Sequence, residues 1–405
     1  MVNYGSGQLG DETISSNTTK NTPVLEYQNL TVQEGVTLTL PSRCRLMVNG
    51  TLTVNGTIKV SPDIAGNGTG GPVGGKSGGN LELMAKTIEG AGTVQADGTD
   101  GQDGNNVSNQ NNGGSGAAYS IPATGASGSG GTAPNRGSNG EYNGNWNGDR
   151  NGGNAGSAHS SVYNDSTLKA YLEDYLISGA YITQSPLDTL LPGAGDSGAG
   201  GGSRELRQYN NNNNNSRYRT RVEIGGGGGG AGGSFVSKGG VGGNGDDEYI
   251  NGNNTNLISQ DDPNNNSTAT IDIWGGESGA GGGAGGFILL VSESVSLDVT
   301  IAARGGNGGD GYWGRNGNGR NIDSNGTYSY FNTNEDVPKR DGGGGGGGSG
   351  GLVIGFTDKT PTLDLAGGSG GIPGAQRLDG SNSNSNSGSA GQSGVTFLYD
   401  IKELL

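Results

Sequence analysis

Apolar and polar residues alternate through much of the first 61 residues. The alternation is clearest in residues 25–32, 36–40 and 51–60, which are rich in β-branched side chains. A period of two residues is typical of a β-strand with one buried face. Asn-Gly pairs at residues 49–50 and 55–56 favour tight turns between such strands. We therefore predict short strands that are antiparallel or stacked as coils, and the near-duplicates at 48–52 and 54–58 indicate a β-solenoid.

Beyond residue 61, glycine runs lead into short apolar stretches. The runs occupy residues 225–230, 279–286 and 342–351, and the last two are followed by Phe287 and Leu352. Glycine in a helix interior costs about 0.8–1.0 kcal/mol relative to alanine, and in a strand it has no side chain to pack. It can adopt the extended threefold helix of the polyproline II type. Several such segments can satisfy one another's N–H and C=O groups, because no side chains keep them apart.

Composition alone supports a different interpretation, a disordered chain. The 405 residues include 90 Gly and 12 Pro, a bias usual in low-complexity sequences. Collagen is excluded because no Gly-X-Y period is sustained. Against disorder stands a repeat: residues 78–104 align without a gap to 285–311, and 350–374 is a shorter version. Each unit consists of two apolar strands and a glycine segment, and such units must stack to bury a face.

Long insertions poor in apolar residues separate the repeat units. One of them contains Leu168, Tyr171, Leu172, Tyr175 and Leu176. This spacing predicts an amphipathic α-helix over 166–178. The predicted fold class is therefore all-β: short β-solenoid-like strands alternating with bundled polyglycine II helices, with one short α-helix. We expect an N-terminal β domain at 1–61 and a glycine-rich domain at 62–405.

The charge balance limits the classes of partner. The formal net charge is −15, from 38 acidic and 23 basic residues. This balance disfavours nucleic acid and anionic membrane surfaces as partners. No run of about 18 apolar residues is present, so we expect a protein that is not embedded in a membrane.

The sequence offers little for catalysis. His159 is the single histidine and Cys44 the single cysteine, so we expect no Ser/His/Asp or Cys/His arrangement, no internal disulfide and no thiol-based metal cluster. A pair of carboxylates for glycan hydrolysis stays open, although scattered acids in an acidic chain are mostly solvated. The prediction is a non-enzymatic protein.

Two segments resemble calcium-binding nonapeptides. They are residues 242–250, which include Asp246, and residues 305–313, which include Asp310. A calcium β-roll needs oxygen ligands from consecutive turns, whereas these copies stand far apart. The favoured interpretation is a solvated end of a glycine segment with no cofactor, and Ca²⁺ is the alternative.

Aromatic residues are concentrated in the polar insertions, and they are the predicted contacts to a receptor. Flat aromatic faces among Asn and Asp suit sugar rings or a protein surface, and they equally suit a lid over a glycine core. These candidates are Tyr142, Trp146, Trp274, Tyr312, Trp313, Tyr328, Tyr330 and Phe331. A basic cluster that includes Arg217, Arg219 and Arg221 is the predicted contact to an acidic partner subunit or an anionic glycan, or else neutralises nearby Asp.

The glycine runs before Phe287 and Leu352, together with the strand–glycine repeats, give the chain a resemblance to a known group. It resembles the glycine-rich tail-fibre adhesins and related tail proteins of tailed viruses. The resemblance implies stacked polyglycine II helices and a receptor-binding role on the exterior of a virion. The implied partners are a host cell-surface glycan or protein and other virion tail proteins.

We therefore predict a viral tail-fibre receptor-binding protein, with residues 1–61 attached to the virion. Long loops on a rigid scaffold are a common way to build a recognition surface. A structural virion component is the first alternative, and an ice-binding glycine-helix protein is the second. The sequence leaves a homo-oligomer open.

Overall fold

The computed structural model of the chain describes residues 2–66, 72–104, 190, 192–196, 198, 217–220, 227–245, 258–261, 268–274, 276–312, 315–322, 328–332, 341–374 and 385–403. The strands before residue 100 are β1 (Asp11–Ile14), β2 (Thr18–Thr19), β3 (Val24–Tyr27), β4 (Asn29–Val32), β5 (Thr37–Leu40), β6 (Cys44–Val54), β7 (Thr57–Val60), β8 (Asn80–Glu89) and β9 (Thr93–Gln95). The later strands are β10 (Arg217–Thr220), β11 (Ile258–Asp261), β12 (Thr268–Trp274), β13 (Phe287–Val295), β14 (Thr300–Ala302), β15 (Arg315–Ile322), β16 (Tyr328–Asn332), β17 (Leu352–Thr357), β18 (Thr362–Asp364) and β19 (Val395–Asp400). A single 3-10 turn, η1 (Ile401–Glu403), closes the described part of the chain.

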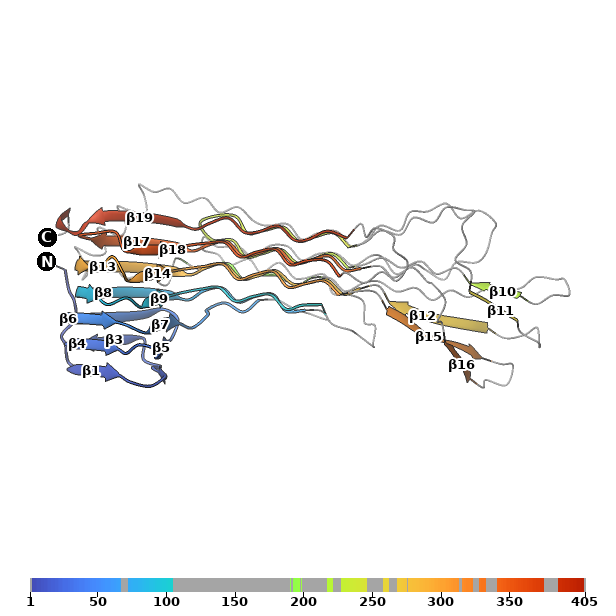
Figure 1. Cartoon of the computed structure of the whole chain (residues 1–405), viewed down its shortest axis with the longest axis horizontal. Helices are drawn as coiled ribbons and strands as arrows, with labels where there is room; N and C mark the ends of the chain where they lie inside the picture. The colour runs from blue at the N-terminus through green and yellow to red at the C-terminus, as the bar shows by residue number, and fades with distance from the viewer. Residues whose placement is uncertain are drawn as a thin grey trace.

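Two parallel β-sheets form the end of the molecule that holds both termini (Figure 1). The large sheet has eight strands in the order β1-β4-β6-β8-β13-β17-β19, with β3 also paired to β6. The small sheet has six strands in the order β18-β14-β9-β7-β5-β2. Successive strands alternate between the sheets along most of the chain, so the chain winds from one sheet to the other. We call this two-sheet part the body.

The predicted fold class is wrong. The described residues form mainly parallel sheets and contain no α-helix, rather than a short solenoid whose strands alternate with helices. The tight turns predicted from the Asn-Gly pairs were wrong, because neither pair closes a hairpin. Gly50 lies inside β6, and Asn55 and Gly56 carry the chain from β6 in the large sheet to β7 in the small sheet. The α-helix predicted over 166–178 lies outside the described residues.

The strand register follows the sequence repeat. β13 pairs with β8 so that Phe287 lies beside Asn80, and β14 pairs with β9 so that Thr300 lies beside Thr93. Both pairings join residues that are 207 apart, which is the offset between the repeats at 78–104 and 285–311. Equivalent residues of the two repeats therefore stack directly on one another. The division into domains 1–61 and 62–405 stays a prediction, and β6 of the first range pairs with β8 of the second.

Apolar side chains fill the space between the two sheets. In the small sheet one register row runs through Leu38, Ile58, Val94 and Ile301, all fully buried. Facing them in the large sheet is the row of Leu46, Leu83 and Leu290, also fully buried. This alternation of inward apolar and outward polar residues is what the period of two predicted.

A second apolar cluster covers the opposite face of the large sheet. Its members include Met47, Met84, Phe287, Val291 and Phe356. The cluster is closed from outside by Val2 and Tyr4 near the N-terminus, by Ile401 near the C-terminus, and by Leu190 and Phe235 from the glycine-rich part of the chain. The large sheet is therefore buried on both faces, as parallel sheets usually are.

Glycine-rich segments continue from the strands as a long bundle, which we call the stalk (Figure 1). The stalk consists of the described residues within 72–79, 96–104, 190–198, 227–245, 276–286, 303–312, 341–351, 365–374 and 385–394. Segments that precede large-sheet strands form its middle layer, and segments that follow small-sheet strands lie on one side of that layer. Residues within 190–198 and 227–245 lie on the other side, where Leu190 and Phe235 reach the body.

The middle segment 279–286 shows how the stalk is held together. Every N–H from Gly279 to Gly286 donates to a carbonyl of another segment, at 2.7–3.0 Å. The acceptors change with a period of three residues, the period of the polyproline II conformation. One set lies on the neighbouring middle segment (Gly343, Gly346, Ser349), one on the small-sheet side (Gln102, Thr99, Ala96) and one on the far side (Asp196, Gly193). This segment is thus bonded to neighbours in three directions.

Direct backbone contact explains the glycine content of the stalk. A Cβ atom added at Gly283 would overlap the backbone of Lys76, and one added at Gly98 would overlap the backbone of Gly283. Ala280 and Ala284 are the exceptions within the middle segment, and both are fully buried. Side chains larger than methyl therefore occur in the stalk mainly at positions that face outward.

Candidate functional site

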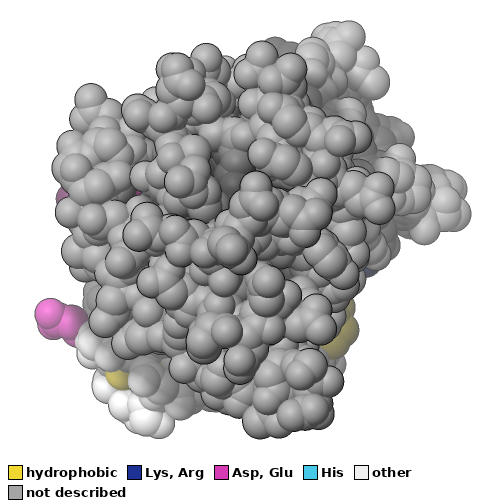
Figure 2. Space-filling model, turned by 90° about the vertical axis from the view of Figure 1, so that its right-hand side faces the viewer, with side chains coloured by type: hydrophobic (Ala, Val, Ile, Leu, Met, Phe, Trp, Pro, Cys, Tyr) yellow, Lys and Arg dark blue, Asp and Glu magenta, His cyan; other side chains and the backbone are white. Residues whose placement is uncertain are grey.

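Two small antiparallel sheets lie at the end of the stalk that is remote from both termini (Figure 1). One pairs β10 with β11, and the other has the order β12-β15-β16. We call this region the distal end. Figure 2 looks onto it, and the described side chains visible at the edge of that view include acidic and hydrophobic ones.

The three-stranded distal sheet collects several of the predicted receptor-contact residues. Trp274 is the last residue of β12 and pairs with Arg315 of β15. Tyr328, Tyr330 and Phe331 lie on β16, beside Ile322, Arg320 and Gly319 of β15. Residues separated by more than 50 positions in sequence are therefore placed on one sheet.

Tyr312 lies where the stalk passes into this sheet. Its N–H donates to the carbonyl of Glu277 at 2.7 Å, and its carbonyl accepts from the N–H of Gly342 at 3.0 Å. The side chain is half-buried. A Cβ atom at Gly276 would overlap the carbonyl of Tyr312, so the backbone of this residue is packed within the stalk. Trp274 is only two residues from Gly276, which places both aromatic residues at the same junction.

The remaining predicted contacts divide into two groups. Arg217 and Arg219 lie on β10, where they pair with Asp261 and Ser259 of β11. Tyr142, Trp146, Trp313, Arg221 and Asp246 lie outside the described residues, as does His159.

A row of threonines crosses the outer face of the small sheet. The register joins Thr37 to Thr57, Thr57 to Thr93, Thr93 to Thr300 and Thr300 to Thr362. Neighbouring strands lie about 4.8 Å apart, so the row is a regular line of hydroxyl and methyl groups. The next outward row is mixed, with Thr39, Lys59, Gln95, Ala302 and Asp364 in register. The first row was missed from the sequence, although a threonine opens the second strand of every repeat.

A ladder of Asp and Asn side chains continues this face along the stalk. Asp97, Asp100 and Asp103 each accept a hydrogen bond from a backbone N–H of the adjacent segment, at 2.7–2.8 Å. The donors are Arg304, Asn307 and Asp310, which follow the same period of three. Asn307 and Asp310 in turn accept from the N–H groups of Ser369 and Ile372, at 2.9 Å. On this outer side of the stalk, the Asp and Asn side chains therefore accept the backbone N–H groups that would bond to carbonyls of a further segment if one were present.

Asp310, the calcium candidate, belongs to this ladder. It is exposed, and its Oδ1 accepts the N–H of Ile372. Among the residues that the structure describes, no group of three or more His, Cys, Asp or Glu side chains is arranged to hold a metal ion. The arrangement accounts for Asp310 as a structural acceptor, and calcium binding stays untested.

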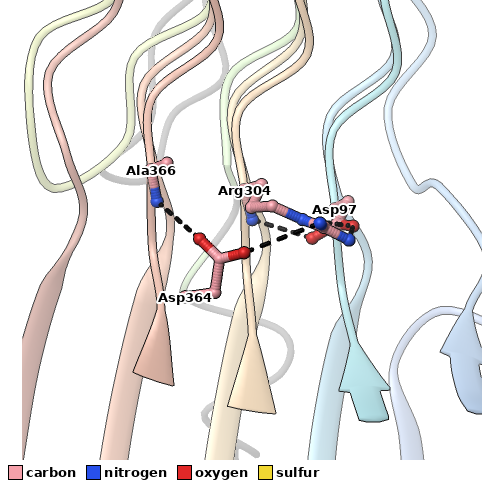
Figure 3. Close-up of polar contacts among 4 residues, drawn as sticks. All are labelled: Asp97, Arg304, Asp364 and Ala366. Atoms are coloured by element: carbon pink, nitrogen blue, oxygen red, sulfur yellow. Dashed lines mark hydrogen bonds and ion pairs between the residues drawn. The ribbon is translucent and has the colours of Figure 1, made fainter. Parts of the chain in front are cut away.

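Arg304 joins three segments of the chain at the point where the body passes into the stalk (Figure 3). Its Nη2 lies 2.7 Å from Oδ2 of Asp97, and its Nη1 lies 3.6 Å from Oδ2 of Asp364. The hydrogen bond with Asp97 raises the pKa of the guanidinium above its ordinary value. Asp364 also accepts the N–H of Ala366 at 3.4 Å. These contacts explain the presence of Arg304 at the junction, because it links the segments that follow β9 and β14 to the last residue of β18.

Cys44 is fully buried in the core of the body. Burial, with a contribution from the charge of Glu82, raises the pKa of its thiol to about 12. A thiol held neutral in this way is a poor nucleophile.

Comparison with known proteins gives no relatives: no family model, no curated protein and no solved structure matches the chain significantly. Within the described ranges, no helix is long and apolar enough to cross a membrane.

Proposed function

We propose that the protein is a non-enzymatic receptor-binding adhesin of a viral tail fibre, whose distal end contacts the host surface. The observation that carries the proposal is the separation of two ends. Both termini belong to the body, whereas the antiparallel sheets with Trp274, Tyr328, Tyr330 and Phe331 lie at the opposite end of the stalk (Figure 1). In this arrangement the body attaches to the virion and the stalk holds the aromatic residues away from it.

The construction of the stalk supports this role. Each N–H of the middle segment is bonded to one of three neighbours, so bending the stalk would break backbone hydrogen bonds in several layers. A rigid support lowers the entropy that must be lost when a receptor binds. Aromatic residues on strands add contact area with few rotatable bonds. The partner is a cell-surface glycan or protein of the host.

The test measures binding of the purified chain to host cells and to an immobilised glycan array, and its ability to block adsorption of the virion. Replacing Tyr328 and Tyr330 together with Ala is expected to weaken binding at least tenfold while the far-UV spectrum stays unchanged. The matched control truncates two half-exposed side chains of the body, Leu9→Ala with Leu297→Ala, and should bind normally.

Two results would count against the adhesin. Wild-type protein that neither binds cells nor blocks adsorption would favour a structural virion component. Loss of binding in the control pair, with normal binding by the distal pair, would mean that the body is the receptor-binding end.

A second candidate function has support from the threonine row. A line of threonines in register from Thr37 to Thr362 across the small sheet is the kind of regular row that an ice-binding protein needs. The charges of Lys59 and Asp364 in the adjacent row interrupt that regularity, which favours the adhesin. Thermal hysteresis that disappears in Thr93→Tyr, and survives in Thr53→Tyr on the large sheet, would reverse this order.

A further inference from the structure

The apolar core between and around the two sheets is covered to a different extent at the edge formed by the N-terminal strands and at the edge formed by the C-terminal strands. At the N-terminal end, Ile14, Tyr27 and Leu30 are at most 3% exposed. At the C-terminal end, Leu363 continues the fully buried row of Ile301 but is only partly buried. Tyr399, beside the fully buried Phe356, is also only partly buried. The apolar core is therefore left partly open at β18 and β19.

The same end carries no charge over long stretches of sequence. Residues 365–376 and 380–399 contain no Asp, Glu, Lys, Arg or His, in a chain with a net charge of −15. Sheet edges in natural proteins are usually protected by charges or proline. At the other edge of the large sheet, β1 begins with Asp11 and Glu12, and Glu12 forms an ion pair with Lys20 at 2.8 Å. Edge strand β19 has no such residue before Asp400.

The uncharged surface continues along the stalk. The stalk segment that follows β9 has Asp97, Asp100 and Asp103 at its outward positions. The segment that follows β18 has Ala366, Ser369 and Ile372 at the equivalent positions. Ile372 is 58% exposed, and Val241, near the last middle segment, is 42% exposed. We call the combined surface of β18, β19, residues 365–374 and residues 385–394 the terminal edge.

We propose that the terminal edge is an interface with a second copy of this chain, with the two stalks side by side and pointing in the same direction. Two copies with a charge of −15 repel each other over most of their surface. The terminal edge reduces that repulsion, because its acidic residues are Asp364 and Asp400 alone, at the ends of β18 and β19. The parallel orientation follows because the uncharged strip includes the stalk. An antiparallel pair would cover β19 and leave Ile372 and Val241 exposed. Pairs with two-fold symmetry are the commonest protein assemblies.

The terminal edge is large enough for such a pair. Strand β19 has six residues, a rise of about 20 Å. Residues 365–374 add roughly 30 Å at the polyproline II rise. With two layers about 10 Å apart, the strip measures on the order of 50 Å by 20 Å. A pair would then bury on the order of 2,000 Å², the size of a stable interface.

The first experiment is sedimentation equilibrium on the full chain, with the double variant Thr396→Glu and Ile372→Glu. Both positions are exposed, so the fold should tolerate the change. We expect a dimer for the wild type and at least a tenfold higher dissociation constant for the variant. Leu9→Glu, an exposed apolar residue outside the terminal edge, is the matched control and should dimerise normally. A wild type that is monomeric at all concentrations, or a variant that dimerises as well as the control, would overturn the proposal.

The second experiment tests the orientation. Cys44 is buried, so a thiol introduced as Ile372→Cys is the reactive one when a short bifunctional thiol reagent is added. Side-by-side stalks should give a covalent dimer in high yield. A dimer that links efficiently through Ser393→Cys but not through Ile372→Cys would contradict the parallel arrangement. Neither experiment depends on receptor binding, so the interface and the proposed adhesin can fail separately.

Discussion

The body and the stalk are built from the same chain segments but have different cores. Segment 279–286 of the stalk continues into strand β13 of the body, whose side chains Ile288 and Leu290 pack between sheets about 10 Å apart. In the stalk the same segment has no side chain beyond a methyl group, and the layers meet backbone to backbone. The backbone hydrogen bonds differ as well. In the body they run between neighbouring strands of one sheet, whereas in the stalk those of segment 279–286 run in three directions.

The comparison shows how a chain with 29% hydrophobic residues can be ordered over a great length. The hydrophobic effect stabilises the body, where apolar area is removed from water. The stalk removes little apolar area, and its stability depends on satisfying every buried N–H and C=O group without leaving a cavity. Ordering glycine carries the largest loss of backbone entropy of any residue. The body therefore provides the fixed register from which the stalk hydrogen bonds extend.

The largest expected effect is that of a side chain inserted into the stalk. Gly368→Val should prevent folding, because a Cβ at this position overlaps the backbone of Gly306. The neighbouring Ser369→Val, at an exposed outward position, should fold with nearly wild-type stability. The measurement is yield of soluble protein and thermal unfolding of both variants. Equal behaviour of the two would show that backbone contact does not determine the stalk.

The next largest effect is a cavity in the body. Ile301→Ala removes a fully buried side chain and should lower the free energy of unfolding by about 2–5 kcal/mol. Leu363→Ala lies in the same register row but at the partly open edge, and should lower it by about half as much. Urea unfolding of both variants compares the positions. A larger loss for Leu363 would mean that the edge of the core is covered.

A smaller effect is expected in the ladder of Asp and Asn side chains. Asp100→Ala removes the acceptor for the N–H of Asn307 and should lower the free energy of unfolding by about 1 kcal/mol. Asp100→Asn keeps an oxygen acceptor and should be nearly neutral, as Asn307 already serves in the adjacent segment. If Asp100→Asn lowered the free energy of unfolding as much as Asp100→Ala, the charge of Asp100 rather than its hydrogen bond would be what stabilises the stalk.

The smallest effect is a pH dependence in the N-terminal segment. Hydrogen bonds from the side chain and backbone of Ser6 lower the pKa of Glu26. A carboxyl group with a lowered folded-state pKa adds stability above its ordinary pKa, and this stability is lost as the pH falls through the lowered value. Ser6→Ala should therefore destabilise the protein slightly at pH 7 and not at pH 2. Because water screens this surface group, a difference above about 1 kcal/mol would be unexpected.

The sequence predicted some of these features for sound physical reasons. The repeat at 78–104 and 285–311 has the offset of the strand register, because equivalent side chains must occupy equivalent places in a stack. The inward rows of Leu, Ile and Val follow from alternation. Among the candidate contacts, Trp274 and the aromatic residues of β16 are joined by strand pairing that no local pattern reveals.

Other features could not be read from the sequence. Asn-Gly pairs indicate a change of chain direction, and they do not distinguish a hairpin from a passage between two parallel sheets. Residues 192–196 resemble a linker in composition, and their place beside the middle layer depends on hydrogen bonds to distant segments. Asp310 fits a calcium motif and a ladder of acceptors equally well, because an Asp side chain supplies the oxygen that either arrangement requires.

Hydrogen exchange of the stalk amides tests the central claim most directly, since an ordered glycine core requires protected glycine N–H groups. Peptides that cover Gly279 to Gly286 should exchange as slowly as those from β13, because both sets of N–H groups are buried and hydrogen-bonded. Exchange in the stalk at the rate of an unfolded chain, with β13 still protected, would contradict the account.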